Sequence, residues 1–241
     1  MKSAILIATL IPCGCGSDKK RPPSNNWVTA DGGIYGETFT GGEFHLGPVE
    51  WEGSIHNSCA PYPSGIQSIE GIYLAGLENT HNGDGQMCDA CVRIETEEGK
   101  SLTLRVVTTG ITTPNSIDVS PQAYALLNSG EYPRLMSWYV TRCPENDRNL
   151  FFQFQTGANI WWTSLWVRNI ALPVSSVEVK STNHPEWYAL TRGGDGTWTD
   201  SSGFGEGPFQ LRVTAIDGQV IQESFDGFEP GELLEGTAQF E

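Results

Sequence analysis

Turn-forming residues recur about every ten positions along residues 148–241 of this chain, in segments such as GGDG, DSSG and IDGQ. They separate short runs that are rich in β-branched and aromatic residues. This spacing is typical of a β-sandwich and leaves little room for a long helix. The expected strands are Phe151–Gln155, Trp161–Asn169, Ser176–Lys180, Glu186–Arg192, Gly196–Asp200, Phe209–Ala215 and Val220–Ser224.

Residues 48–145 have a different texture and predict a separate domain. One helical pattern stands out there, because Ser120 is a good N-cap, Pro121 suits the first helical position and Gly130 marks a stop. The polar segment CPENDRNL separates the two halves and suits a short linker. The strand-like runs of this first half are Cys91–Glu95, Leu102–Thr108 and Arg134–Thr141.

The N-terminus has the features of an export signal. Lys2 precedes the apolar run Ala4–Pro12, which is too short to span a bilayer. Residues 1–15 are therefore assigned to a signal peptide and residues 16–47 to a linker or N-terminal extension. Cys15 leaves two outcomes open, a lipoprotein anchor on its thiol or plain secretion. The expected location is extracellular in either case.

The cysteines support export. Beyond the signal region the chain has Cys59, Cys88, Cys91 and Cys143, and an even number in an exported chain implies disulfides. The CDAC segment has no second C-x-x-C and no histidine pair beside it, so a zinc site is not expected. We expect neither a metal nor any other cofactor.

The net charge of −15 restricts the partners of the chain. A chain this acidic is poorly suited to nucleic acid or to an anionic membrane surface. We expect a monomer whose contact with a membrane is limited to the lipid anchor considered above.

Four segments carry a family resemblance when they are taken together. MCDACVRIETEEGKSLTLRVV, IDVSPQAYALL, WYVTRCP and WWTSLWVRN occur in this order. The combination resembles expansins of the bacterial or microbial expansin-like group, over about Val49 to Glu241. The order is specific, whereas no single segment would be.

The resemblance implies an all-β fold with two domains. The first would be a six-stranded double-psi β-barrel related to family-45 endoglucanases. The second would be an immunoglobulin-like β-sandwich of carbohydrate-binding module family 63. It also implies the disulfides Cys59–Cys88 and Cys91–Cys143. The implied function is to bind cellulose or a related plant cell-wall β-1,4-glucan and to loosen the wall network without hydrolysis.

Asp118 is the carboxylate that the resemblance makes essential. Many relatives carry a second Asp upstream, and here Thr108 lies in that region, which keeps a hydrogen-bonding group but no charge. A second difference lies at VEWEG, where Glu50 takes roughly the place of a family Thr and Trp51 that of an aromatic residue. Glu50 either lies on a solvated edge or faces Asp118 across the groove.

Hydrolysis of a glycosidic bond normally needs two carboxylates about 5 to 9.5 Å apart. A Glu50–Asp118 pair therefore leaves a weak endo-β-1,4-glucanase as an alternative. A peptidoglycan-active double-psi barrel lipoprotein is a further alternative, and so is a binding module without loosening activity.

The tryptophans predict the binding surface, because flat aromatic rings stack well on the C–H faces of sugars. The resemblance makes Trp161 and Trp162 two members of a three-ring cellulose platform. The usual third ring, a Tyr in the next hairpin, is absent from RGGDGTWT, where Trp198 either contributes or points inward. Strand alternation places Trp162 and Trp166 on one outer face, with Trp161 exposed only if it lies at the irregular start of the strand. We therefore predict that Trp166 extends the platform.

Overall fold

The computed structural model describes residues 36–47, 49, 58–59, 73–81, 84–111, 113–144 and 147–241. The predicted signal peptide, Cys15, Glu50 and Trp51 lie outside the described residues.

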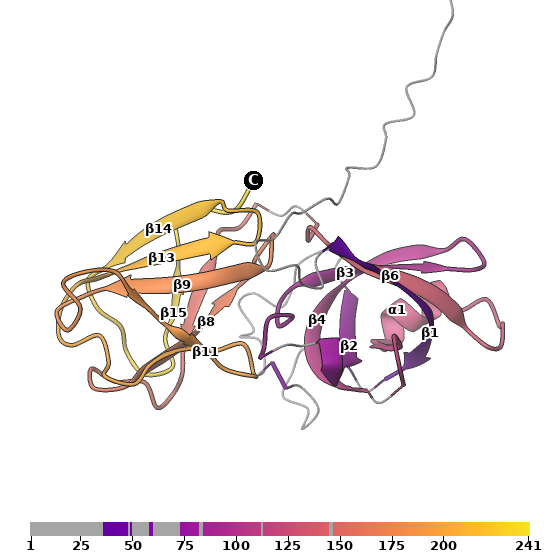
Figure 1. Ribbon diagram of the computed structural model, residues 1–241, viewed down its shortest axis with the longest axis horizontal. Helices are drawn as coiled ribbons and strands as arrows, with labels where there is room; N and C mark the ends of the chain where they lie inside the picture. Colours follow the sequence, from indigo (N-terminus) through magenta and orange to yellow (C-terminus); the bar gives the residue numbers. More distant parts are fainter. Residues whose placement is uncertain are drawn as a thin grey trace, which may run out of the picture.

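Six strands of the described residues close into the predicted barrel, in the order β1-β5-β2-β4-β3-β6. The pairs β1–β5 and β2–β4 are parallel, whereas the other described neighbours are antiparallel (Figure 1). The strands are β1 (Thr38–Leu46), β2 (Tyr73–Glu78), β3 (Cys91–Thr96), β4 (Ser101–Ile111), β5 (Ile117–Val119) and β6 (Leu135–Thr141), and a short 3₁₀ turn, η3 (Asn79–His81), follows β2.

The barrel begins earlier than the predicted boundary at residue 48, because β1 is one of its strands. Two adjacent glycines conceal β1 in the sequence. Gly41 has a positive φ of 76°, and the register with β6 shifts between Thr40 and Gly42. A Cβ atom at Gly42 would lie 2.0 Å from the carbonyl oxygen of Asn115. Because two backbones approach closely here, only glycine fits at this position. The alternation of apolar and polar residues that identifies a strand in a sequence is therefore interrupted.

An α-helix, α1 (Pro121–Leu127), packs Ala123 and Leu127 into the barrel core. Ser120 occupies the N-cap position and Pro121 begins the helix, as the sequence predicted. The Ser120 hydroxyl does not cap the helix but accepts a hydrogen bond of 3.4 Å from the backbone N–H of Leu74. The start of α1 is thereby tied to β2.

The second domain is the predicted β-sandwich. In the described part of the chain, one sheet has the order β10-β9-β13-β14 and the other β11-β12-β8-β7-β15 (Figure 1). The first sheet consists of β9 (Val174–Lys180), β10 (Tyr188–Ala189), β13 (Phe209–Ala215) and β14 (Val220–Phe225). The second consists of β7 (Phe151–Phe154), β8 (Thr163–Arg168), β11 (Thr191–Arg192), β12 (Trp198–Asp200) and β15 (Leu233–Glu235).

One expected strand, Glu186–Arg192, is divided between the two sheets. β10 pairs with β9 in the first sheet, and β11 pairs with β12 in the second. Leu190 lies between them, is buried in the sandwich core and donates its backbone N–H to Val177 at 2.9 Å. The chain therefore crosses between the sheets at a buried residue, which periodicity alone does not reveal.

The CDAC segment lies where the two domains meet. Both implied disulfides are present, and they join Cys88 to Cys59 and Cys91 to Cys143. The backbone N–H of Cys143 in turn donates to the carbonyl of Ala171 in the second domain at 2.9 Å. All four thiols are used in these bonds, so none of them is a zinc ligand.

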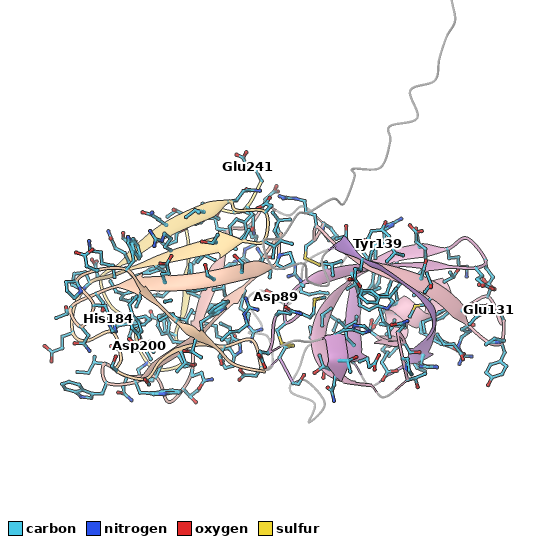
Figure 2. All side chains as sticks on the ribbon, viewed as in Figure 1. Asp89, Glu131, Tyr139, His184, Asp200 and Glu241 are labelled. Carbon is cyan, nitrogen blue, oxygen red and sulfur yellow. A yellow bond between two sulfur atoms is a disulfide. The ribbon has the colours of Figure 1, made fainter. Side chains whose placement is uncertain are left out.

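Asp89, inside CDAC, is buried at the junction of the domains (Figure 2). Its carboxylate accepts a hydrogen bond of 2.6 Å from Nη1 of Arg105 and one of 3.4 Å from the backbone N–H of Ile170. Nη1 of Arg105 also lies 3.3 Å from the carbonyl oxygen of Ile170. Burial raises the pKa of Asp89, although the guanidinium groups of Arg105 and Arg168 act in the opposite direction.

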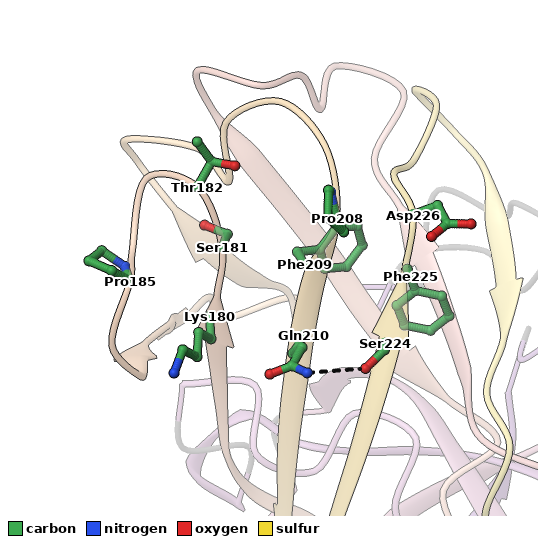
Figure 3. Close-up of a pocket in the computed structure, with 10 residues that line it drawn as sticks. All are labelled: Lys180, Ser181, Thr182, Pro185, Pro208, Phe209, Gln210, Ser224, Phe225 and Asp226. Carbon is green, nitrogen blue, oxygen red and sulfur yellow. Dashed lines mark hydrogen bonds between the residues drawn. The ribbon is translucent and has the colours of Figure 1, made fainter.

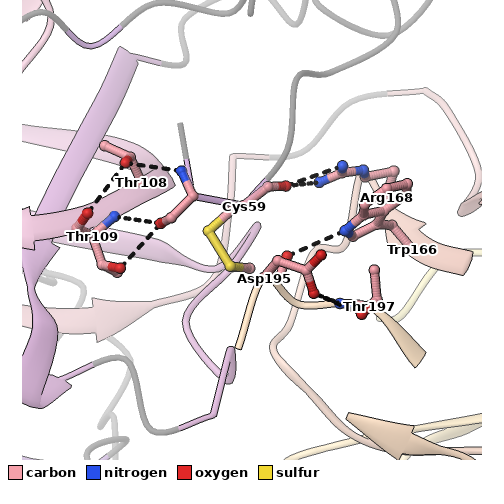
Figure 4. The surroundings of a disulfide bond; sticks show 9 residues. Cys59, Thr108, Thr109, Trp166, Arg168, Asp195 and Thr197 are labelled. Carbon is pink, nitrogen blue, oxygen red and sulfur yellow. Dashed lines mark hydrogen bonds between the residues drawn. A yellow bond between two sulfur atoms is a disulfide. The ribbon is translucent and has the colours of Figure 1, made fainter. Parts of the chain in front are cut away.

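Arg168 makes a second connection across the junction. Both of its terminal nitrogens donate to the carbonyl oxygen of Cys59 at 3.1 Å (Figure 4). Burial lowers the pKa of Arg168 to about 10, so the side chain is still charged at neutral pH. A small apolar cluster also spans the domains, with Val49, Leu74 and Val107 packed on Phe151. Charge, hydrogen bonds and apolar contacts thus hold the domains together.

We expect Asp89→Asn to lower the free energy of unfolding by about 3–5 kcal/mol, because it leaves Arg105 buried without its counter-charge. Urea unfolding followed by circular dichroism measures this. Asp147→Asn, at an exposed position, is the matched control and should change stability by less than about 0.5 kcal/mol. Equal midpoints for the two variants would contradict a stabilising role of the Asp89–Arg105 pair.

Candidate functional site

Asp118 lies in a row of laterally paired residues on four barrel strands. It pairs with His45 of β1 on one side and with Gly76 of β2 on the other. Gly76 pairs in turn with Thr108 of β4. Laterally paired residues project to the same face of a sheet, so this row lines one face of the barrel wall.

Two glycines make room for the Asp118 carboxylate. A Cβ atom at Gly47 would lie 2.5 Å from Cβ of Asp118, and one at Gly76 would lie 2.8 Å from Cγ2 of Thr108. Side chains at either position would therefore collide with the row. As a result the Asp118 side chain keeps 31% of its surface exposed although it is set into the barrel wall.

His45 is the ionisable neighbour of Asp118. Its Nδ1 lies 3.8 Å from Oδ1 of the carboxylate. Burial raises the pKa of Asp118, and the charge that His45 carries when protonated acts in the opposite direction. The sequence analysis missed this pair because β1 was not recognised as a strand. The predicted partner, Glu50, and the predicted groove aromatic, Trp51, lie outside the described residues and stay predictions.

Thr108 belongs to the same row, but its hydroxyl is bonded to backbone. It accepts a hydrogen bond of 3.1 Å from the N–H of Ser58 and lies 3.4 Å from the carbonyl oxygen of Thr109, to which it donates (Figure 4). The Ser58 hydroxyl accepts the N–H of Thr109 at 2.8 Å. Thr108 therefore holds the segment that leads to Cys59 against β4.

Trp161 and Trp162 lie in the turn before β8. Trp161 is 73% exposed and Trp162 is half-buried. The side-chain oxygen of Asn159 accepts the backbone N–H groups of both, at 2.9 and 3.1 Å. The Thr163 hydroxyl donates to the Asn159 carbonyl at 3.0 Å. The prediction that Trp161 is exposed at an irregular strand start is confirmed.

The prediction for Trp166 is wrong. Its side chain is only 9% exposed, and its indole N–H donates to the carbonyl oxygen of Asp195 at 3.1 Å (Figure 4). The guanidinium of Arg168 lies 5.0 Å from the ring centroid. β8 is an inner strand whose outward face is covered by the turn between β11 and β12 at this point, which strand alternation cannot show.

Trp198 does not replace the missing platform ring either. It is buried in the sandwich core, and the guanidinium of Arg192 lies 4.5 Å from its ring centroid. The expectation that Trp198 contributes to substrate binding is therefore wrong, and the alternative, an inward orientation, is confirmed.

Tyr188 is an exposed aromatic residue that the sequence analysis did not single out. Its ring is 44% exposed and stacks on His184, with centroids 4.1 Å apart and planes 7° apart. His184 is held in turn by Asp200, 2.7 Å away, and both lie at the end of the sandwich remote from the barrel (Figure 2). The adjacent WY pair at 187–188 was the available sequence signal.

Within the described residues, no group of three or more His, Cys, Asp or Glu side chains is arranged to hold a metal ion. The same residues include no helix that is long and apolar enough to cross a membrane.

Comparison with known proteins supports the resemblance seen in the sequence. Residues 150–224 match the family model of the expansin C-terminal domain. Expansin-like protein 5 of Dictyostelium discoideum is 24% identical over 69% of this chain and 72% of its own length. Expansin-YoaJ of Bacillus subtilis is 23% identical over 76% of this chain and 78% of its own length.

Solved structures show the same fold. The apo Clavibacter michiganensis expansin has a TM-score of 0.69 and 18% identity, over 84% of this chain and 98% of that one. A mutant Clavibacter michiganensis expansin in complex with cellohexaose has a TM-score of 0.68, with the same identity and coverage.

The barrel and the sandwich have the fold of the solved expansin structures. Residues 150–224 match the expansin C-terminal domain, and the chain is similar in sequence to expansins over about 70% of its length.

We expect Asp118→Asn to stabilise the protein at pH 7. The pKa of Asp118 in the folded protein is raised above its ordinary value of 3.8. Ionisation of the carboxyl group therefore destabilises the folded protein at neutral pH. This cost disappears well below pH 3.8, where the group is protonated in the folded and the unfolded protein alike. The gain in Tm should therefore shrink as the pH falls toward 3.8.

Differential scanning calorimetry between pH 4 and 8 measures this difference, with Asp147→Asn as a control that should show no such trend. A variant that is less stable than the wild type at pH 7 would contradict the cost assigned to burial of the carboxylate.

The different environments of Trp166 and Trp161 predict stability losses of different size when each is replaced by Ala. Trp166→Ala should cost about 3–5 kcal/mol, because it removes a buried ring that is hydrogen-bonded and covered by Arg168. Trp161→Ala should change stability by no more than about 0.5 kcal/mol. Urea unfolding followed by far-UV circular dichroism compares them. Similar small losses in both would show that Trp166 does not contribute to the folded sheet.

Proposed function

We propose that this protein is secreted, binds cellulose or a related β-1,4-glucan, and loosens polysaccharide networks without hydrolysing them. The observation that carries the proposal is the adjacent pair of the exposed Trp161 and the half-buried Trp162 on a turn held by Asn159. Rings held in this way give apolar contact to sugar faces at little entropic cost. The fold shared with an expansin in complex with cellohexaose supports a ligand of this class.

The Asp118 row supports gripping a glucan rather than cleaving it. In the described residues, the neighbours of Asp118 in this row are His45, Gly76 and Thr108, and none of them is a carboxylate. Glycoside hydrolysis normally needs a second carboxylate to act as base or nucleophile. We propose that Asp118 hydrogen-bonds glucan hydroxyls in the groove and competes with contacts between glucan chains.

Secretion is part of the proposal. The two disulfides fit an oxidising compartment, and the N-terminal sequence has the pattern of an export signal. Lipidation at Cys15 would keep the protein at the cell surface, whereas a protein without this lipid anchor would be released.

A weak endo-β-1,4-glucanase is the second candidate function, and one observation favours it. The pKa of Asp118 is raised by burial, which suits a general acid. Glu50 would then supply the base. Release of reducing ends from amorphous cellulose that is abolished by Asp118→Asn would establish this activity, and release of soluble fragments from purified peptidoglycan instead would establish the peptidoglycan-active alternative.

We expect Trp161→Ala and Trp162→Ala each to weaken binding to microcrystalline cellulose by about tenfold, which corresponds to about 1.4 kcal/mol. Asp118→Asn should bind normally but lose the extension of stressed cellulose paper. Depletion binding assays and constant-load extension measure the two effects separately.

Tyr132→Ala is the matched control, because it removes a ring that is 83% exposed on the barrel. The proposed function fails if the Trp161 and Trp162 variants bind like the control. It also fails if Asp118→Asn extends paper like the wild type.

A further inference from the structure

A pocket of about 450 Å³ opens on the sheet that contains β9, β13 and β14 (Figure 3). Its floor is a row of laterally paired residues, Lys180, Gln210 and Ser224, one from each strand. The Trp161–Trp162 turn instead precedes β8 of the other sheet. The pocket is therefore separate from the aromatic pair.

Apolar groups form the walls of the pocket. Pro185 on the loop after β9 and Pro208 before β13 stand on its sides, and the half-buried Phe225 contributes apolar surface (Figure 3). Clefts of roughly 300–1,000 Å³ with apolar walls and a few convergent polar groups are typical of small-ligand sites. The pocket has that size and composition.

The polar groups of the pocket are varied. Lys180 offers donors, Asp226 offers acceptors, and Gln210 and Ser224 offer both. The side chains of Gln210 and Ser224 are 3.4 Å apart, at the long end of hydrogen bonding. A ligand whose hydroxyls both donate and accept satisfies such a set, because each hydroxyl adapts to the group it meets.

The charges balance. Lys180 and Asp226 lie on opposite sides of the pocket, so the lining carries one positive and one negative charge (Figure 3). The next cation on the sheet, Arg212, is already paired with Glu178, its Nε lying 2.6 Å from Oε2. A neutral ligand therefore suits this surface better than an anionic or a cationic one.

We propose that this pocket binds a neutral sugar unit at the end or branch of a polysaccharide, as a second glycan site of the sandwich domain. The pocket is open to solvent, and its volume accommodates one or two sugar units against the polar row between Pro185 and Pro208. With sites on both sheets, one sandwich domain contacts two glycan segments at once, and such bivalency raises the overall avidity.

The two sites are structurally connected. The loop that carries Thr182 also carries Asn183, whose side-chain nitrogen donates to the carbonyl oxygens of Ser202 and Gly203 at 3.1 and 2.9 Å. The N–H of Gly205 donates to the carbonyl oxygen of Ile160, beside Trp161, at 3.0 Å. These contacts fix the two sites in one rigid end of the domain.

The test uses the full-length protein with Trp161→Ala and Trp162→Ala combined, which removes the aromatic pair. Cellobiose is titrated while backbone and side-chain amide resonances are recorded by NMR. We expect saturable shifts at Gln210 and Ser224 with a Kd in the millimolar range. Gln210→Ala in the same background should weaken binding at least tenfold, and Gln222→Ala, exposed in the neighbouring row of the same sheet, should leave it unchanged.

Glucuronate and glucosamine serve as anionic and cationic probes of similar size. The proposal is overturned if the double tryptophan variant shows no shifts at Gln210 and Ser224, if Gln210→Ala and Gln222→Ala bind alike, or if either charged sugar binds more tightly than cellobiose. Because the aromatic pair is absent throughout, these outcomes do not depend on the cellulose binding proposed for Trp161 and Trp162.

Discussion

The buried carboxylate of Asp89 is the interaction on which the two-domain structure depends. It lies between two disulfide-bonded cysteines of the barrel and binds Arg105 of the barrel and the backbone of Ile170 in the sandwich. The Asp89–Arg105 pair lies within the barrel, and the backbone N–H of Ile170 completes the hydrogen bonds of this buried carboxylate from the sandwich. Separation of the domains would remove that hydrogen bond from a buried charge, which is costly.

The row of residues around Asp118 shows how glycines make room for a polar site in a barrel wall. Gly47 and Gly76 carry no side chains, and the space they leave is occupied by the Asp118 carboxylate and by Thr108. His45 provides a proton-binding neighbour without adding a second acid. Among the described residues of this row Asp118 is the single carboxylate, whereas hydrolysis of a glycosidic bond normally needs two.

Much of this structure was predictable from the sequence, and the exceptions have physical reasons. The sandwich strands, α1 and the exposure of Trp161 follow from turn spacing, capping residues and strand irregularity, and the family resemblance implied the disulfide pairing. β1 was missed because its two glycines and bulge erase the alternation, and His45 was missed with it. Trp166 was placed wrongly because alternation tells which face a residue is on but not what covers that face.

In the turn that carries Trp161 and Trp162, the backbone conformation and the aromatic surface depend on different residues, and Asn159 determines the first. Its side-chain oxygen fixes the backbone of Trp161 and Trp162, whereas the indoles themselves provide the aromatic surface. The order of the surface and its chemistry are thus encoded by different residues. Substitutions among aromatic side chains can therefore change the shape of this surface while the turn is kept, so the surface can diverge among relatives without any remodelling of the sandwich.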